Sequence, residues 1–147
     1  MWRRWRTPVL LVLWVLALGG CALLGREPEA REIAIDLRVA RSEAVRRTLA
    51  AFREQGYAVR EGLTSGLEPE TESFRQGDEA DAVFRATITG SAERSRVVLT
   101  GTYRRRQLAG LVRGPERPVR RSDDPVERSL WARLDNVGLM IRRPPAH

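Results

Sequence analysis

This 147-residue chain has few of the side chains that most enzymes and metalloproteins use. It contains one cysteine, Cys21, one histidine, His147, and no lysine, so all 26 basic residues are arginine. No disulfide can form within the chain, and one cysteine and one histidine are too few for a zinc site of the usual type. His147 is the last residue, so we do not expect a catalytic cysteine–histidine pair on an ordered scaffold. Glycine-rich phosphate loops are also absent. We therefore expect no enzymatic activity, no metal and no cofactor.

The sequence also lacks an apolar run long enough for a stable membrane span. The apolar run at residues 9–18 would make a helix of roughly 15 Å, about half of the hydrocarbon core of a bilayer. Arg3, Arg4 and Arg6 precede this run, and Gly19 and Gly20 follow it. A positive start, a short apolar segment and small residues before a cut are the parts of a secretory signal. Residues 1–20 are therefore predicted to be an export signal that is removed.

The segment Leu18-Gly19-Gly20-Cys21 resembles the lipobox of bacterial lipoprotein precursors. The resemblance implies a diacylglycerol on the Cys21 sulfur, cleavage before Cys21 and a further acyl chain on the new amino group. Because stable anchoring takes more than one acyl chain, this modification would hold the protein on a membrane. An ordinary cysteine behind a generic signal is the alternative. Ala22, where an inner-membrane lipoprotein would carry Asp, favours the periplasmic face of the outer membrane over the inner membrane.

The predicted mature chain of 127 residues suffices for one domain with a modest core. It carries 23 arginines and 19 acidic residues. A basic chain ordinarily suggests nucleic acid, but an exported protein rarely meets any, so we expect no nucleic-acid partner. Acidic residues gather in 65–82 and nine arginines in 94–121. A solvated loop and a solvated edge explain this simply, while a basic face for anionic lipid, lipopolysaccharide phosphates or an acidic partner is the sharper interpretation.

We predict three segments after the signal. Residues 21–31 form a tether from the lipidated cysteine, residues 32–143 form the folded domain, and residues 144–147 form a C-terminal tail. Alternating apolar residues from Ile33 to Val39 predict a strand. A helix is predicted next, with Ser42 as its N-cap and a stop at Gly56. Its apolar face is expected to comprise Val45, Leu49 and Phe52.

The second half of the domain is predicted to be a hairpin followed by a helix. A strand at 57–63 leads into a long loop at 64–79 that we expect to stay outside the core. Strands at 81–89 and 96–105 then form the hairpin. Residues 106–121 read as an arginine-rich loop, in which Leu108, Leu111 and Val112 either extend the hairpin or form an apolar tip. Asp124 is expected to cap a final helix whose apolar stripe comprises Val126, Leu130, Leu134, Val137 and Ile141.

These elements follow one another in the order β-α-β-β-β-α. Amphipathic helices and strands with one apolar face each are best satisfied by a two-layer sandwich of the α/β (α+β) class. Both helices are expected on one face of a four-stranded sheet, with Tyr103 and Trp131 as packing residues. The other face should be polar and open, and its expected residues are Asp36, Arg38, Arg85, Thr87, Thr100 and Thr102.

A second resemblance covers most of the mature chain. Cys21, Ile33-Ala34-Ile35, Gln55-Gly56-Tyr57 and Ala80-Asp81-Ala82-Val83-Phe84, followed by a strand through Tyr103 and a C-terminal helix, look like the layout of the lipopolysaccharide-assembly lipoproteins. The resemblance implies a sandwich that plugs an outer-membrane β-barrel and contacts lipopolysaccharide. Other envelope lipoproteins use similar domains as scaffolds, including activators of cell-wall synthases. We therefore expect a non-enzymatic binding or scaffolding role, with these two functions as alternatives.

Four arginines are the candidate binding residues for an anionic ligand: Arg104, Arg105, Arg106 and Arg113. Adjacent strand residues alternate in direction, so Arg104 and Arg106 should share one face and Arg105 the other. We expect the Arg105 side chain to extend into water beyond the packed region. Arg104, Arg105 and Arg106 would then form a compact positive tip, suited to phosphate groups, beside the loop that contains Arg113.

Overall fold

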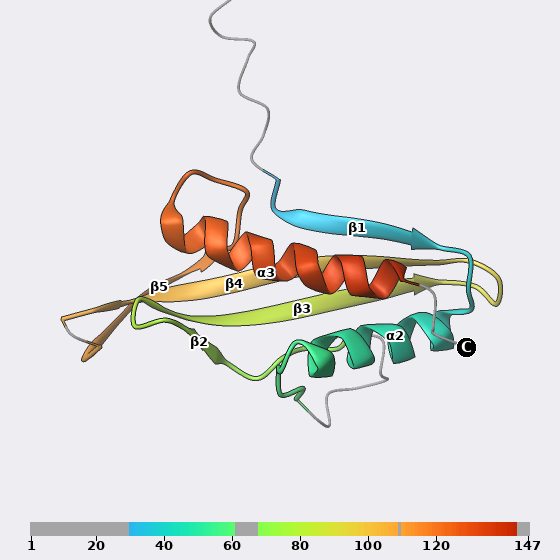
Figure 1. The fold of residues 1–147 in the computed structure, drawn as a ribbon, viewed down its shortest axis with the longest axis horizontal. Helices are drawn as coiled ribbons and strands as arrows, with labels where there is room; N and C mark the ends of the chain where they lie inside the picture. Colours follow the sequence, from blue (N-terminus) through green and yellow to red (C-terminus); the bar gives the residue numbers. More distant parts are fainter. Residues whose placement is uncertain (1–29, 61–67, 109, 144–147) are drawn as a thin grey trace, which may run out of the picture.

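The computed structural model describes residues 30–60, 68–108 and 110–143. The predicted signal, Cys21 and the predicted tail lie outside these ranges. The described elements, in chain order, are β1 (Glu32–Leu37), α2 (Arg41–Glu54), β2 (Phe74–Gln76), β3 (Ala80–Gly90), β4 (Ser95–Gln107), β5 (Val112–Pro118) and α3 (Pro125–Arg142). Figure 1 shows both helices lying along the long strands of one sheet. The α+β class is therefore confirmed.

The sheet is antiparallel and its strand order is β1-β4-β3-β2, with β5 also paired to β4. One edge of β4 serves two partners: its first half, up to Thr100, pairs with β1, and its second half, from Thr102, pairs with β5. The described residues thus form five strands, so the prediction of four is wrong. Two of the five were not predicted: β2 lies inside the predicted loop at 64–79, and β5 lies inside the predicted loop at 106–121.

The predicted strand at 57–63 and the predicted loop at 64–79 are also corrected. Within the described residues of 57–63, Val59 makes one isolated bridge, to Thr71. Thr71 is fully buried, and its hydroxyl accepts a hydrogen bond from the Phe84 backbone N–H at 3.0 Å. The segment packs because β3 is 11 residues long and the unpaired groups on its outer edge need partners. β2 and the residues just before it supply them.

The buried face of α2 agrees with the prediction at Phe52 and partly at Val45, which packs against the core, but not at Leu49. Its buried residues are Ala44, Thr48, Ala51 and Phe52, whereas Leu49 is only half-buried. Two alanines allow close approach to the sheet, and the Thr48 hydroxyl is satisfied by the Ala44 carbonyl at 2.8 Å. The helix starts after Ala40 without a side-chain cap, so the prediction of Ser42 as N-cap is wrong.

The prediction for α3 is confirmed. Asp124 is its N-cap and accepts hydrogen bonds from the backbone N–H groups of Val126 and Glu127, at 3.0 and 3.1 Å. All five residues of the predicted stripe are buried. Gly138 is buried and faces Ile33 and Ile35 of β1, and a Cβ there would make ordinary van der Waals contact with both. Neither helix in the described residues is long and apolar enough to cross a membrane.

The core lies between the helices and one face of the sheet. The opposite face is polar as predicted: Asp36, Arg85 and Thr87 are exposed there, and Thr100 and Thr102 are half-buried. Arg38 lies beyond the end of β1 and is not part of this face. Asp36, Glu70 and Asp81 on this side are ion-paired. Glu70, in the predicted solvated loop, has a side chain only 10% exposed and pairs with Arg60 and Arg85.

Candidate functional site in the arginine-rich hairpin

The candidate site is the hairpin that β4 and β5 form beyond Glu32, the first residue of β1. It projects from the body of the sheet at one end of the molecule (Figure 1). β5 contains Pro115 and Pro118, which is why its sequence reads as a loop. Proline is tolerated in a strand at the edge of a sheet, where an N–H is not needed on the outer side, and β5 pairs only with β4. The hairpin therefore positions the predicted arginines on paired strands.

Arg104 lies opposite Glu116 in the β4–β5 ladder. The Arg104 Nη2 atom is 2.9 Å from a Glu116 carboxylate oxygen, and both side chains are 51% exposed. The hydrogen bond from Arg104, assisted by Thr102, lowers the pKa of Glu116. Such an exposed pair contributes little to folding. Arg104 can therefore release the Glu116 carboxylate and bind another anion.

Arg105 faces the opposite side of the sheet from Arg104 and Arg106, as predicted. Its side chain does not simply extend into water, however, and that expectation is corrected. It forms an ion pair with Asp124, the N-cap of α3. The hydrogen bond to Asp124 raises the pKa of Arg105, and the pKa of Asp124 is lowered by the Glu127 backbone N–H and by Arg105. Arg105 thus connects β4 to the start of α3.

Tyr103 supports the same junction. It is buried, as predicted, and its hydroxyl donates a hydrogen bond to the Glu127 carboxylate at 2.7 Å. Burial, together with this bond to an anion, raises the pKa of the Tyr103 hydroxyl. Ser122 donates to the other oxygen of Glu127. Tyr103 and Arg105 therefore hold the base of the hairpin against α3 and have a structural role.

Arg106 and Arg113 are directly opposite each other in the β4–β5 ladder, and they share one carboxylate. Arg106 Nη2 lies 3.0 Å from Oδ1 of Asp81, and Arg113 Nε lies 3.2 Å from Oδ2. The second contact is an ion pair without hydrogen-bond geometry. Asp81 is 10% exposed and Arg113 is 64% exposed. Two cations on one anion leave an excess positive charge at this point of the hairpin.

The structure therefore brings together only two of the four predicted arginines. Arg106 and Arg113 gather around Asp81, whereas Arg104 and Arg105 have separate carboxylate partners on opposite sides of the sheet. Arg104, Arg105 and Arg106 thus do not form the predicted compact positive tip, because each pairs with a different carboxylate. A sequence argument identified the strand directions correctly but had no means of identifying carboxylates that come from β3, β5 and α3.

Beyond the arginines, the hairpin ends in apolar side chains. Leu108 is 73% exposed, Leu111 is 88% exposed and Val112 is 44% exposed. Val112 begins β5, and Leu108 and Leu111 belong to the turn. Both predicted alternatives are thus partly fulfilled, because the hairpin is extended and also ends in an apolar tip. Leu108 has a φ of 50°, a left-handed conformation that bulky residues rarely adopt.

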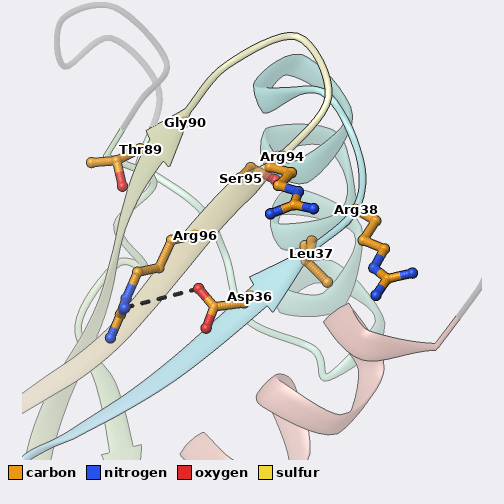
Figure 2. Close-up of a pocket in the computed structure, with 8 residues that line it drawn as sticks. All are labelled: Asp36, Leu37, Arg38, Thr89, Gly90, Arg94, Ser95 and Arg96. Carbon is orange, nitrogen blue, oxygen red and sulfur yellow. Dashed lines mark ion pairs between the residues drawn. The ribbon is translucent and has the colours of Figure 1, made fainter.

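A second feature, at the opposite end of the sheet, was not predicted. A cleft of about 530 Å³ lies beside the β3–β4 turn, and Figure 2 shows Arg38, Arg94 and Arg96 around it. Arg96 is 3.9 Å from Asp36, and this weak pair is drawn in Figure 2. Arg94 lies in the turn and Arg96 lies in β4, on either side of Ser95, but nothing in the sequence places Arg38 beside them.

No family model matches this chain, and no curated protein matches it significantly. In the part of the chain that the structure describes, no group of three or more histidine, cysteine or acidic residues is arranged to hold a metal ion.

Proposed function

We propose that this chain is a lipid-anchored lipoprotein of the bacterial cell envelope with a non-enzymatic binding or scaffolding role. The observation that carries the proposal is the position of Cys21. The only cysteine in the sequence stands directly after an arginine-rich start, a ten-residue apolar run and two glycines. Ala22 favours the periplasmic face of the outer membrane.

The domain behind this anchor has two surfaces suited to binding. The polar face of the sheet is not covered by either helix, and the β4–β5 hairpin projects beyond the body of the sheet. Neither the polar face nor the tip of the hairpin belongs to the core between the helices and the sheet. A domain of this kind can hold a partner while its core remains unchanged, as a scaffolding role requires.

The experiment that tests the anchor is the substitution Cys21→Ala in the full-length precursor. Lipid transfer to the sulfur precedes cleavage in the lipoprotein route, so the variant should remain uncut and retain residues 1–20. Ala22→Asp is the matched control, because it changes the neighbouring residue without removing the acceptor sulfur and should still be cut and lipidated. A normally cut, lipid-free Cys21→Ala product would show that the signal is a generic one.

A second candidate function is lipopolysaccharide assembly, which the hairpin favours because its two strands carry five arginines and one glutamate between Tyr103 and Pro118. Guanidinium groups bind phosphate through two parallel hydrogen bonds. The exposed Arg104 and Arg113 are the residues to change. Arg104→Gln with Arg113→Gln should weaken binding of lipopolysaccharide, most clearly at low salt. Arg128→Gln, an exposed arginine on α3, is the control and should leave binding unchanged.

A further inference from the structure

We propose that the tip of the β4–β5 hairpin inserts Leu108 and Leu111 into the surface of an anionic lipid bilayer. This inference deepens the proposed function, since it rests on the placement of the domain at a membrane. It assigns to the hairpin a direct contact with lipid that is separate from the anchor at Cys21.

The first argument is the exposure of the tip. Three of the four large apolar side chains that are exposed in the described residues lie within it: Leu108, Leu111 and Val112. An apolar cluster in water at the end of a projecting hairpin is typical of a contact surface. Three side chains can cover only a small part of the roughly 800 Å² that each partner buries in a stable protein interface. Its size suits shallow insertion between lipid headgroups.

The second argument is the backbone of Leu108. Its φ of 50° belongs to the left-handed region, in which glycine or asparagine is the usual turn residue. A leucine there is unfavourable for the isolated protein on two counts, because its backbone is strained and its side chain is 73% exposed. Strain of this kind is retained at sites with a function. Under this proposal, the function of Leu108 is to insert its side chain into lipid.

The third argument is the positive charge behind the tip, which favours lipid over protein as the binding partner. The facing residues Arg106 and Arg113 are one ladder position behind the pair Gln107 and Val112. At about 3.3 Å per strand residue, the backbone of these two arginines lies within about 10 Å of the leucines. The Arg106 Nη1 atom lies 3.5 Å from the position that a Cβ at Gly110 would occupy, so this guanidinium group is beside the tip. Apolar groups of an interfacial element insert roughly 5–10 Å, which places the arginines at the level of the headgroups. Because the two arginines share Asp81, their excess charge complements lipid phosphates.

The experiment places a fluorescent reporter at the tip. Under the proposed function the sulfur of Cys21 is blocked by lipid, so Leu111→Cys introduces the only reactive thiol in the full chain. An environment-sensitive dye at this position is compared with the same dye at Leu139→Cys, a leucine on α3 that is 52% exposed. The chain is reconstituted in vesicles of phosphatidylcholine, with or without an equal part of phosphatidylglycerol.

In vesicles with phosphatidylglycerol, the dye at position 111 should shift its emission to shorter wavelengths and be quenched by spin-labelled lipid. The dye at position 139 should remain in water. High salt and Arg113→Gln should each reduce the quenching at position 111. Leu108→Asn should reduce it too, without lowering thermal stability, because asparagine tolerates the left-handed backbone. Losing one inserted leucine should weaken the partition of the tip by roughly 10- to 100-fold.

Two results would overturn the inference. One is a dye at position 111 that stays in water in both vesicle types. The other is a photocrosslink from position 111 to one envelope protein without lipid quenching, which would assign the tip to a protein partner. The parent chain separates this failure from failure of the proposed function. Labelling of its only cysteine would show that Cys21 carries no lipid, whatever the tip does.

Discussion

The pair of substitutions Leu130→Ala and Leu49→Ala tests how the two helices pack on the sheet. From sequence alone both leucines belong to apolar stripes and should be equally costly to remove. In the structure Leu130 is completely buried, whereas Leu49 is half-buried and does not belong to the core cluster. Removal of a fully buried leucine forfeits its transfer free energy and leaves a cavity, which together cost about 2–5 kcal/mol.

Leu49 should cost much less. Truncation of this half-buried side chain leaves no enclosed cavity and loses only part of the roughly 1.5–3 kcal/mol that full burial of a leucine provides. We therefore expect Leu49→Ala to lower the free energy of unfolding by about 1 kcal/mol. Urea unfolding of the two variants and the parent, followed by circular dichroism, gives each free energy of unfolding by linear extrapolation. The m-values should be equal. Equal losses at both positions would show that α2 presents Leu49 to the sheet and that the described orientation of this helix is wrong.

Three further substitutions test the sheet and its junction with α3. Gly101→Ala places a Cβ 2.9 Å from the Phe84 ring and 3.0 Å from Val119, so it should lower the free energy of unfolding by about 1–3 kcal/mol, measured in urea. Asp124→Asn keeps the cap acceptor but loses the charge paired with Arg105, which should cost at most about 1 kcal/mol at pH 7. Because folding lowers the pKa of Asp124 from 3.8, its charge stabilises the fold above that pH, and the difference from the parent should vanish as the pH falls through the folded pKa. Arg105→Gln should lower stability at pH 7 by a similar amount, and a variant as stable as the parent would mean that the Arg105–Asp124 pair contributes nothing.

The elements that the sequence predicts correctly are those whose determinants are local. Asp124, Pro125 and Glu127 form a complete helix start within four residues, and the apolar stripe of α3 follows at regular spacing. The hairpin strands β3 and β4 show simple alternation. Each of these signals acts between near neighbours in the chain, so no knowledge of the tertiary packing is needed.

The wrong predictions concern residues whose structure depends on contacts with distant parts of the chain. Besides the predicted Phe52, the buried face of α2 consists of alanine and threonine, which a ranking by hydrophobicity does not reveal. Pro115 and Pro118 indicate a loop, but the long unpaired edge of β4 accepts them in a strand. Glu70 is buried because Arg60 and Arg85 neutralise it. In each case a contact across the fold overrides the local preference.

The candidate site shows the same division. Alternation along β4 predicts that Arg105 faces away from Arg104 and Arg106, and the partners of these side chains agree with it. The identity of those partners depends on strand register and on the position of α3. The apolar tip was visible as a cluster of leucines and valine, whereas the strained backbone of Leu108 required the structure.

The central claim is that Cys21 is the lipidated first residue of the mature protein, and mass spectrometry of the membrane-extracted protein tests it most directly. The N-terminal peptide should begin at Cys21 and carry the mass of a diacylglycerol on its sulfur, with a further acyl chain on its amino group. A mature N-terminus at another residue, or an unmodified Cys21 in that peptide, would contradict the account.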